Sequence, residues 1–153
     1  MKTEGLPLEF EDDPTPEQVR FLEDRLYDFN VGATGIADGR LLAIFVRGDD
    51  GQILAGLCGH TWGRCCEIRQ LWVEEARRGA GIGTTLLRAA EDEARRRGCD
   101  QILLTTHSFQ APALYRKLGF EVIATAADYP HGHQQLWMRK RLGGAVPRSV
   151  GTK

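Results

Sequence analysis

Apolar residues recur along this chain with two spacings, which predict an alternation of strands and helices. A spacing of two residues, or a short continuous apolar run, indicates a strand, whereas a spacing of three or four indicates a helix with one buried face. Strands are expected at residues 6–10, 41–46, 52–62, 65–73, 101–106, 120–124 and 134–138. Helices are expected at residues 16–29, 81–97 and 112–118.

Local signals delimit the first helix. Thr15 fits the N-cap, Pro16 the first helical position, and Gln18 the return partner of a capping box. Four apolar residues follow at helical spacing, and they predict one buried face: Val19, Leu22, Leu26 and Phe29. Residues 30–35 are expected to form a flexible loop after this helix.

Turn and stop signals separate the later elements. Asp49-Asp50-Gly51 is typical of a hairpin turn between the second and third strands. Gly98 has the position of a glycine just beyond the end of the second helix. The predicted inner face of that helix consists of Leu86, Leu87, Ala90 and Ala94.

The predicted order is strand, helix, three antiparallel strands, helix, strand, helix and two strands. This order favours an α/β fold (an α+β mixed sheet), in which a central, mostly antiparallel sheet carries helices on both faces. A length of 153 residues fits one domain. We expect that domain to cover residues 1–142 and to be followed by a loose tail, residues 143–153.

Composition and charge exclude several classes of function. The formal net charge of -1 gives no electrostatic reason to expect binding to nucleic acid or to an anionic membrane surface. No apolar run approaches the ~20 residues of a spanning helix. The N-terminus lacks the apolar core of a signal peptide, so a cytoplasmic protein is expected.

The four cysteines form no C-x-x-C pair, so no metal is expected. Buried small side chains are the simplest interpretation of Cys58, Cys65, Cys66 and Cys99.

Residues 71–87 carry the most specific signal, because a strand leads through a glycine-rich loop into a strongly patterned helix. Three glycines stand within five positions: Gly79, Gly81 and Gly83. Glycine lets the backbone approach a ligand closely, and the amides of a helix N-terminus attract an anion. Arg77 and Arg78 add positive charge. The segment therefore predicts a phosphate site.

The identity of the phosphate ligand depends on the spacing. A nucleotide P-loop requires a lysine that is missing here, and a dinucleotide fingerprint requires glycine where this chain has Thr84 or Leu86. Arg78, Gly81 and Gly83 match the pattern R/Q-x-x-G-x-G/A of acyl-CoA loops. The alternative is a glycine-rich turn that packs the helix on the sheet.

A second block, residues 108–120, selects between these alternatives. Ala111, Tyr115, Lys117, Gly119 and Phe120 match the pattern N-x-x-A-x-x-x-Y-x-K-x-G-F in register, with Ser108 in place of Asn. With both blocks, the chain resembles the GNAT (Gcn5-related) N-acetyltransferase superfamily. It looks similar to an uncharacterised bacterial subgroup with S-F-Q-A-P and D-Y-P-x-G-H segments, here residues 108–112 and 128–133.

The resemblance implies a single-domain acyl-CoA N-acyltransferase fold that takes acetyl-CoA as co-substrate. It implies direct transfer of the acetyl group to a primary amine of a small molecule or peptide, with no metal, and a homodimer, as for many members. In the family the strand before the loop separates from its neighbour and holds the thioester arm. The residues that the resemblance assigns to the acyl-CoA are Leu71, Trp72, Val73, Arg78, Gly79, Ala80, Gly81, Ile82, Gly83, Thr84, Ser108, Ala111 and Tyr115.

Two residues carry the expected chemistry. Tyr115 matches the family's general acid for the CoA thiolate; the alternative is a tyrosine packed in the core. Glu67 is the candidate general base, and alternation along the strand predicts that Glu67, Arg69, Leu71 and Val73 share one face. The alternative for Glu67 is a simple ion pair with Arg69. Weaker base candidates are His107, Asp128, His131 and His133, and His60 is expected to be structural.

The acceptor is expected between residues 30–34, the strand that carries Trp62, and residues 128–133. Its candidate contacts are Asn30, Trp62, Asp128 and His133, with Phe29 and Tyr129 as further lining. The alternative function is a non-catalytic acyl-CoA-binding or regulatory module on the same fold. Acetylation of protein lysine is a third hypothesis.

Overall fold

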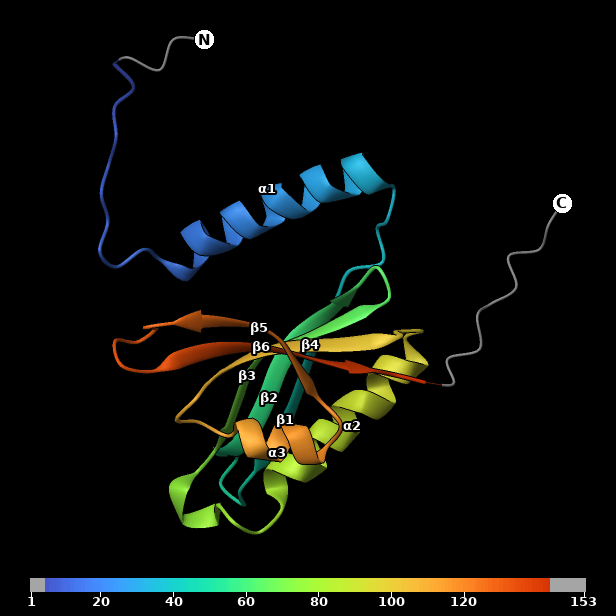
Figure 1. Cartoon of the computed structure of the whole chain (residues 1–153). Helices are drawn as coiled ribbons and strands as arrows, with labels where there is room; N and C mark the ends of the chain where they lie inside the picture. The colour runs from blue at the N-terminus through green and yellow to red at the C-terminus, as the bar shows by residue number, and fades with distance from the viewer. Residues whose placement is uncertain (1–4, 144–153) are drawn as a thin grey trace, which may run out of the picture. The chain divides into compact units, whose positions relative to one another are not determined.

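The computed structural model describes residues 5–143. The chain divides into two compact units, residues 1–36 and 37–153. The described part of the first unit contains one helix, α1 (Pro16–Thr34), and the second contains the sheet with its helices (Figure 1).

The start of α1 is as predicted, but its end is not. The Thr15 Oγ1 accepts from the Gln18 amide at 3.2 Å, and the Gln18 side chain accepts from the Thr15 amide at 2.7 Å, so the capping box is confirmed. The loop expected at residues 30–35 is wrong, because the helix continues to Thr34. It ends at Gly35, which has a φ of 72° and whose amide donates to the Val31 carbonyl.

The strand expected at residues 6–10 is also wrong, since this segment is irregular. Alternation of Leu6, Leu8 and Phe10 fits a strand, but a strand needs a hydrogen-bonding neighbour, and the first unit offers only a helix. Phe10 is 92% exposed. The apolar pattern alone therefore did not produce a strand.

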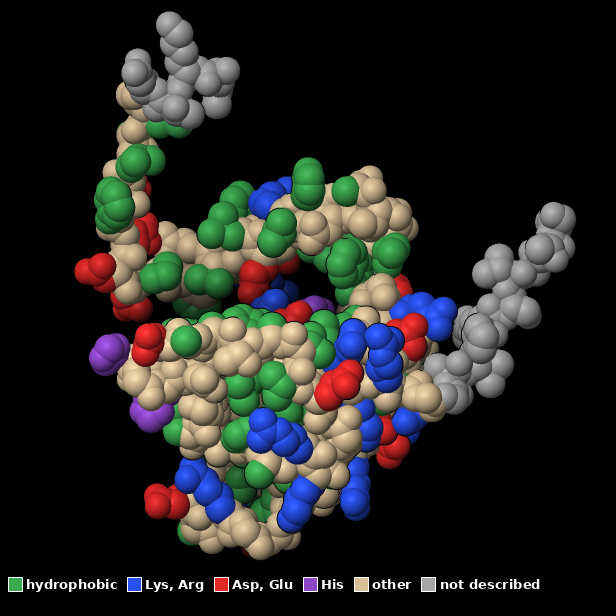
Figure 2. All heavy atoms as spheres, in the orientation of Figure 1, with side chains coloured by type: hydrophobic (Ala, Val, Ile, Leu, Met, Phe, Trp, Pro, Cys, Tyr) green, Lys and Arg blue, Asp and Glu red, His purple; other side chains and the backbone are tan. Residues whose placement is uncertain are grey.

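The apolar stripe of α1 is present but exposed. Figure 2 shows apolar side chains along the helix, and four of them are exposed: Val19, Leu22, Leu26 and Phe29. The prediction of a buried face is not met within this unit. A lone helix has no second layer in its own unit against which to bury its stripe.

Six strands form one sheet in the order β1-β2-β3-β4-β6-β5. Their bounds are β1 (Arg40–Arg47), β2 (Ile53–Trp62), β3 (Cys65–Val73), β4 (Gln101–His107), β5 (Glu121–Ala127) and β6 (Gln134–Arg141). All neighbours pair antiparallel except β3 and β4, which are parallel and are connected through α2 (Ile82–Arg96). The mostly antiparallel mixed sheet is thus confirmed, as is the hairpin turn at residues 49–51.

One hydrophobic core joins the sheet to α2 and to α3 (Pro112–Lys117). The predicted inner face of α2 is buried, namely Leu86, Leu87, Ala90 and Ala94. Both helices contribute to the same core and lie on the same face of the sheet (Figure 1). The expectation of helices on both faces stays a prediction.

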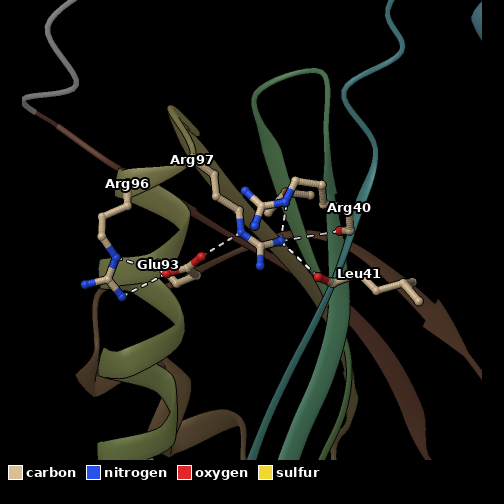
Figure 3. A network of polar contacts seen from close by, with 6 residues as sticks. Arg40, Leu41, Glu93, Arg96 and Arg97 are labelled. Atoms are coloured by element: carbon tan, nitrogen blue, oxygen red, sulfur yellow. Dashed lines mark hydrogen bonds and ion pairs between the residues drawn. The ribbon is translucent and has the colours of Figure 1, made fainter.

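A half-buried arginine, Arg97, ties the end of α2 to the sheet (Figure 3). The side chain of Arg97 is 11% exposed, and its guanidinium donates to the Leu41 carbonyl at 3.0 Å and to Thr61 Oγ1 at 3.2 Å. Glu93, one turn earlier, accepts from Arg97 at 2.8 Å and also pairs with Arg96. These hydrogen bonds lower the pKa of the Glu93 carboxyl. The network therefore ties the C-terminal end of α2 to β1 and β2.

Candidate active site

The parallel strands β3 and β4 separate halfway along their length. Their ladder pairs Cys65 with Gln101 and ends at Ile68 and Leu104. Beyond that point β3 continues to Val73 paired only with β2, and β4 continues to His107 paired only with β6, among the strands described. Backbone groups on the facing edges of the two strands are therefore available to a ligand. This is the separation that the resemblance implies.

A β-bulge lies on β3 where the separation begins. Cys58 pairs with Gln70 and Gly59 pairs with Ile68, so Arg69 is the extra residue. The extra residue reverses the alternation of side chains between the two faces of β3. Leu71 and Val73 therefore pack against the core, on the same face as Ile68. The prediction that Leu71 and Val73 share a face with Glu67 and Arg69 is therefore wrong. Glu67 and Arg69 lie on the opposite face of the sheet.

Gly59 permits the bulge, and the sequence pattern did not single it out. A Cβ at this position would overlap the carbonyl oxygen of Glu67 and lie 2.9 Å from its carbonyl carbon and 3.0 Å from the Ile68 Cα. Only glycine allows the two strands to approach so closely. The available signal was an isolated glycine inside an apolar strand, which often marks a bulge or a close backbone approach.

We predict that Gly59→Ala lowers the free energy of unfolding by about 2–3 kcal/mol, because backbone atoms must move to admit the methyl group. Gly56→Ala is the control in the same strand. Its Cβ would meet the Phe45 ring at 2.7 Å, and a side chain can turn away. Denaturant unfolding measures both variants. Equal losses would contradict the special role of Gly59.

The glycine loop follows β3 directly and is braced by its own arginines. A short 3-10 helix, η1 (Glu75–Arg77), starts the loop, and Arg77 pairs with Glu74 at 2.9 Å. The Nε of Arg78 donates to the Val73 carbonyl at 3.0 Å. Arg78 therefore holds the loop against the end of β3, and its other guanidinium nitrogens remain as donors for an anion.

The loop ends in a helix N-terminus that suits an anion. Gly79 and Gly81 have φ values of 80° and 81°, and a Cβ on either would meet only open space. Gly81 is the N-cap of α2 and supplies no side-chain cap, so the first-turn amides of residues 82–84 lack acceptors from the helix. Converging amides, a helix dipole and neighbouring arginines fit the pyrophosphate of CoA. Ala80, Ile82, Gly83 and Thr84 lie in this segment, and their contacts with acyl-CoA stay predictions.

Tyr115 lies on α3 within the core. The residue is 8% exposed, and its ring meets that of Phe120 edge to face at a centroid distance of 5.9 Å. Burial raises the pKa of its phenol above the ordinary value of 10.0. The phenol stays protonated at neutral pH and has a proton to donate, as a general acid requires.

Glu67 lies at the start of the separation, between two basic side chains. Its Oε2 is 3.6 Å from the His60 Nε2 and its Oε1 is 3.8 Å from the Arg69 Nε. Both distances are long for an ion pair, and the Glu67 side chain is 47% exposed. The expected pairing with Arg69 is thus present but loose. A carboxylate held this way is open to an incoming amine.

Glu67 and Arg69 line a cleft of about 450 Å³ at the boundary of β3 and β4. The other lining residues are Ile68, Leu103, Leu104, Thr105, Ile123, Trp137 and Met138. The sequence pattern did not identify the apolar wall, since β4, β5 and β6 become neighbours only in the sheet. This cleft is the candidate acceptor site.

Ser108 and Asp128 have structural partners. Ser108 Oγ accepts from the Gln134 amide at 3.1 Å, and the Ser108 amide donates to the Gln134 carbonyl at 2.9 Å. Asp128 Oδ1 accepts from the Gly132 amide at 3.3 Å. These bonds brace the loop between β5 and β6. The expected contacts of both side chains with a ligand stay predictions, as does that of Ala111, which packs against the core.

Aromatic rings gather where β4 ends. His107 stacks on Phe109 at 5.4 Å and meets Tyr129 at 5.1 Å, while Phe109 meets His133 at 5.0 Å. The structure thus brings His107, Tyr129 and His133 together, and Phe109 is the member that sequence reasoning missed. His131, in the same loop, is exposed.

Trp62, another expected acceptor contact, does not join this group. Trp62 pairs with Cys65 at the end of the sheet opposite to Val73, so it does not share a site with residues 128–133. That expectation is wrong, because β2 runs antiparallel to β3 and carries Trp62 away from the glycine loop. Trp72, which was expected to contact acyl-CoA and not the acceptor, is 50% exposed near the end of β3, and its contact stays a prediction. Asn30 belongs to α1 in the first unit, and its role stays a prediction.

The cysteines are only partly as expected. Cys66 and Cys99 are buried, whereas Cys58 and Cys65 are half-buried. Burial raises the pKa of the Cys65 thiol to about 11 and that of the Cys66 thiol to about 12.

Within residues 5–143, no group of three or more His, Cys, Asp or Glu is placed to hold a metal ion. No helix in the part of the chain that the structure describes is long and apolar enough to cross a membrane.

Comparison with known proteins identifies the family. The acetyltransferase (GNAT) family profile matches residues 6–120. An acetyltransferase of Agrobacterium fabrum (strain C58) is 36% identical over 126 residues, which cover 82% of this chain and 92% of the relative. The blasticidin-S acetyltransferase of Streptomyces morookaense is 35% identical over 65% of this chain and 76% of its own length.

A crystal structure assigned as an acetyltransferase from Agrobacterium tumefaciens has a TM-score of 0.79 and 34% identity, covering 90% of this chain and all of that chain (100%). The protein therefore belongs to the GNAT family of acetyltransferases, and it is an acyltransferase enzyme of that type.

Proposed function

We propose that the enzyme transfers an acetyl group from acetyl-CoA to a primary amine of a small molecule or peptide. The observation that carries the proposal is the separation of β3 from β4 directly before the glycine loop and the uncapped start of α2. A solved aminoglycoside 6'-N-acetyltransferase in complex with coenzyme A shares the fold, at 18% identity and a TM-score of 0.60. Relatives named for blasticidin-S and streptothricin support a small-molecule acceptor.

The donor side uses the loop and the edge of β3. The amides of residues 79–84, with Arg78, bind the pyrophosphate, and the open edge of β3 at residues 71–73 binds the arm that carries the thioester. Acetyl-CoA supplies an activated acyl group, as its thioester, when bound. The bulge at Arg69 directs Leu71 and Val73 to the core face and Glu67 to the other, so donor and acceptor reach the separation from opposite faces of the sheet.

The chemical step needs one base and one acid. The amine nitrogen attacks the thioester carbonyl, the new N–C bond forms, and the C–S bond breaks. Glu67 accepts the proton that the amine loses, and the Tyr115 hydroxyl donates a proton to the leaving sulfur. Solvent then returns a proton to Tyr115 and removes one from Glu67, so the overall reaction is balanced.

The proposal is tested by measuring thiol release from acetyl-CoA over a panel of primary amines. We expect turnover with at least one small amine, and we expect Glu67→Gln to reduce its kcat/KM about 100-fold. Glu121→Gln is the matched control, since Glu121 is an exposed β5 glutamate paired with Arg139 at 3.4 Å. Equal rates for Glu67→Gln and the wild type would remove Glu67 as the base.

A further inference from the structure

Glu67 stands in the middle of a row of three residues that crosses the sheet. On one side it pairs with Leu103 of β4, directly before the last pair of that ladder. On the other side it pairs with His60 of β2. Residues that pair directly project to the same face of a sheet, so the three side chains lie next to one another on the face opposite the core.

The acceptor cleft borders only one side of this row. Glu67 and Leu103 line the cleft, whereas His60 is not among its lining residues. An acceptor that fills the cleft shields that side of the Glu67 carboxylate from water, and His60 borders the other side. The His60 side chain is 27% exposed, so it contacts solvent. The imidazole therefore connects Glu67 to solvent while the cleft is occupied.

The two side chains approach each other through His60 Nε2 and Glu67 Oε2, which are 3.6 Å apart. This distance is longer than a hydrogen bond of about 2.7–3.2 Å. Hydrogen bonds between catalytic groups are often long without substrate and shorten in the complex. The strands keep the pair in register, because Gly59 lies so close to the Glu67 carbonyl that no side chain fits between them.

The neighbours of His60 on this face of the sheet leave Glu67 as its acidic partner. Leu41 pairs with His60 from β1. On β2 itself, Cys58 and Trp62 stand two residues to either side. Arg69 approaches the other carboxylate oxygen, Glu67 Oε1, at 3.8 Å. Glu67 Oε2 is thus the oxygen that faces the imidazole.

We infer that His60 relays to solvent the proton that Glu67 takes from the amine. This inference rests on the proposed function and adds a positioning residue to its chemical step. The O–H bond of Glu67 breaks as His60 Nε2 binds the proton, which regenerates the carboxylate and leaves an imidazolium. The imidazolium loses its Nδ1 proton to water, and exchange with water restores the starting tautomer. Imidazole suits this role because it gains and loses protons near neutral pH.

His60→Ala, measured with and without imidazole in the buffer, tests the relay. The acceptor is 2-phenylethylamine, whose ring suits the apolar lining of the cleft, or the best substrate of the amine panel. We expect kcat to fall about tenfold while KM for both substrates is unchanged. Imidazole fits the space that His60 leaves, so it should restore part of the lost kcat. The double variant His60→Ala/Glu67→Gln should show no recovery, because imidazole acts through Glu67.

Two further variants separate proton relay from a structural role, which its place in a strand predicts for His60. His60→Gln keeps a donor for Glu67 but does not relay a proton, so we expect the same loss of kcat as in His60→Ala. Wild-type kcat in His60→Gln would overturn the inference. Cys58→Ala is the matched control on the same face of β2, where Cys58 donates to Gln70 at 2.7 Å. It should keep the wild-type kcat and ignore imidazole, and a loss equal to that of His60→Ala would also overturn the inference.

Thiol release from acetyl-CoA distinguishes failure of the inference from failure of the proposed function. If the wild type releases no thiol with any amine of the panel, the acetyl transfer is overturned and the relay with it. If the wild type turns over an amine and His60→Ala has the same kcat, only the relay is overturned. The relay alone is also overturned by a reduced kcat that imidazole does not restore.

Discussion

Gly81→Glu is expected to abolish measurable CoA binding while the protein remains folded. Gly81 is the N-cap of α2, with a φ of 81° and open space where a side chain would start. A glutamate there projects into the anion site and repels the pyrophosphate. We expect at least a 100-fold loss of affinity, which corresponds to about 3 kcal/mol. Isothermal titration calorimetry with CoA measures it.

The control must carry the same backbone strain at another place. Gly51→Glu provides it, because Gly51 has a φ of 82° in the β1–β2 hairpin and also faces open space. Both variants should lose similar stability, since glutamate is disfavoured at positive φ. Only Gly81→Glu should lose CoA. Wild-type CoA affinity in a folded Gly81→Glu protein would refute the assignment of the loop.

Tyr115→Phe is expected to reduce kcat about 100-fold or more while the KM for acetyl-CoA changes little. The hydroxyl acts on the leaving sulfur, whereas the affinity for CoA depends on the loop. Because an acid must be protonated, activity falls as pH rises through its pKa. Burial raises that pKa above 10.0, so this alkaline limb of the wild-type profile lies above pH 10 and disappears in the variant.

Phe120→Leu distinguishes chemistry from packing. It removes the ring that meets Tyr115 but keeps the hydroxyl. We expect a lower free energy of unfolding, by about 1–2 kcal/mol, and a much smaller loss of kcat than in Tyr115→Phe. If both variants reduce kcat equally, Tyr115 acts through core packing and not as an acid.

Features that depend on neighbouring residues were predictable from the sequence. The capping box at Thr15, the inner face of α2 and the bounds of β3 follow from local spacing, and the structure confirms them. The glycine loop and the block at residues 108–120 were sufficient to indicate the family. Local hydrogen bonds and side-chain period produce these signals, so they can be read along the chain.

Features that depend on pairing were not predictable. Alternation at residues 6–10 indicated a strand that has no partner strand. Alternation through β3 placed Glu67 and Leu71 on one face, because nothing in β3 itself marks Arg69 as an extra residue. The evidence for the bulge lies on β2, where Gly59 approaches the Glu67 backbone.

The sequence by itself determined the GNAT family, the anion loop and the candidate acid and base. Only the tertiary structure decided which face Glu67 occupies and that Leu103, Ile123 and Trp137 complete a cleft with Glu67 and Arg69. The physical reason is how far apart in the sequence the interacting residues lie. A donor loop is built from consecutive residues and a helix start, whereas the acceptor cleft is assembled from four strands whose register and bulge are set by their neighbours.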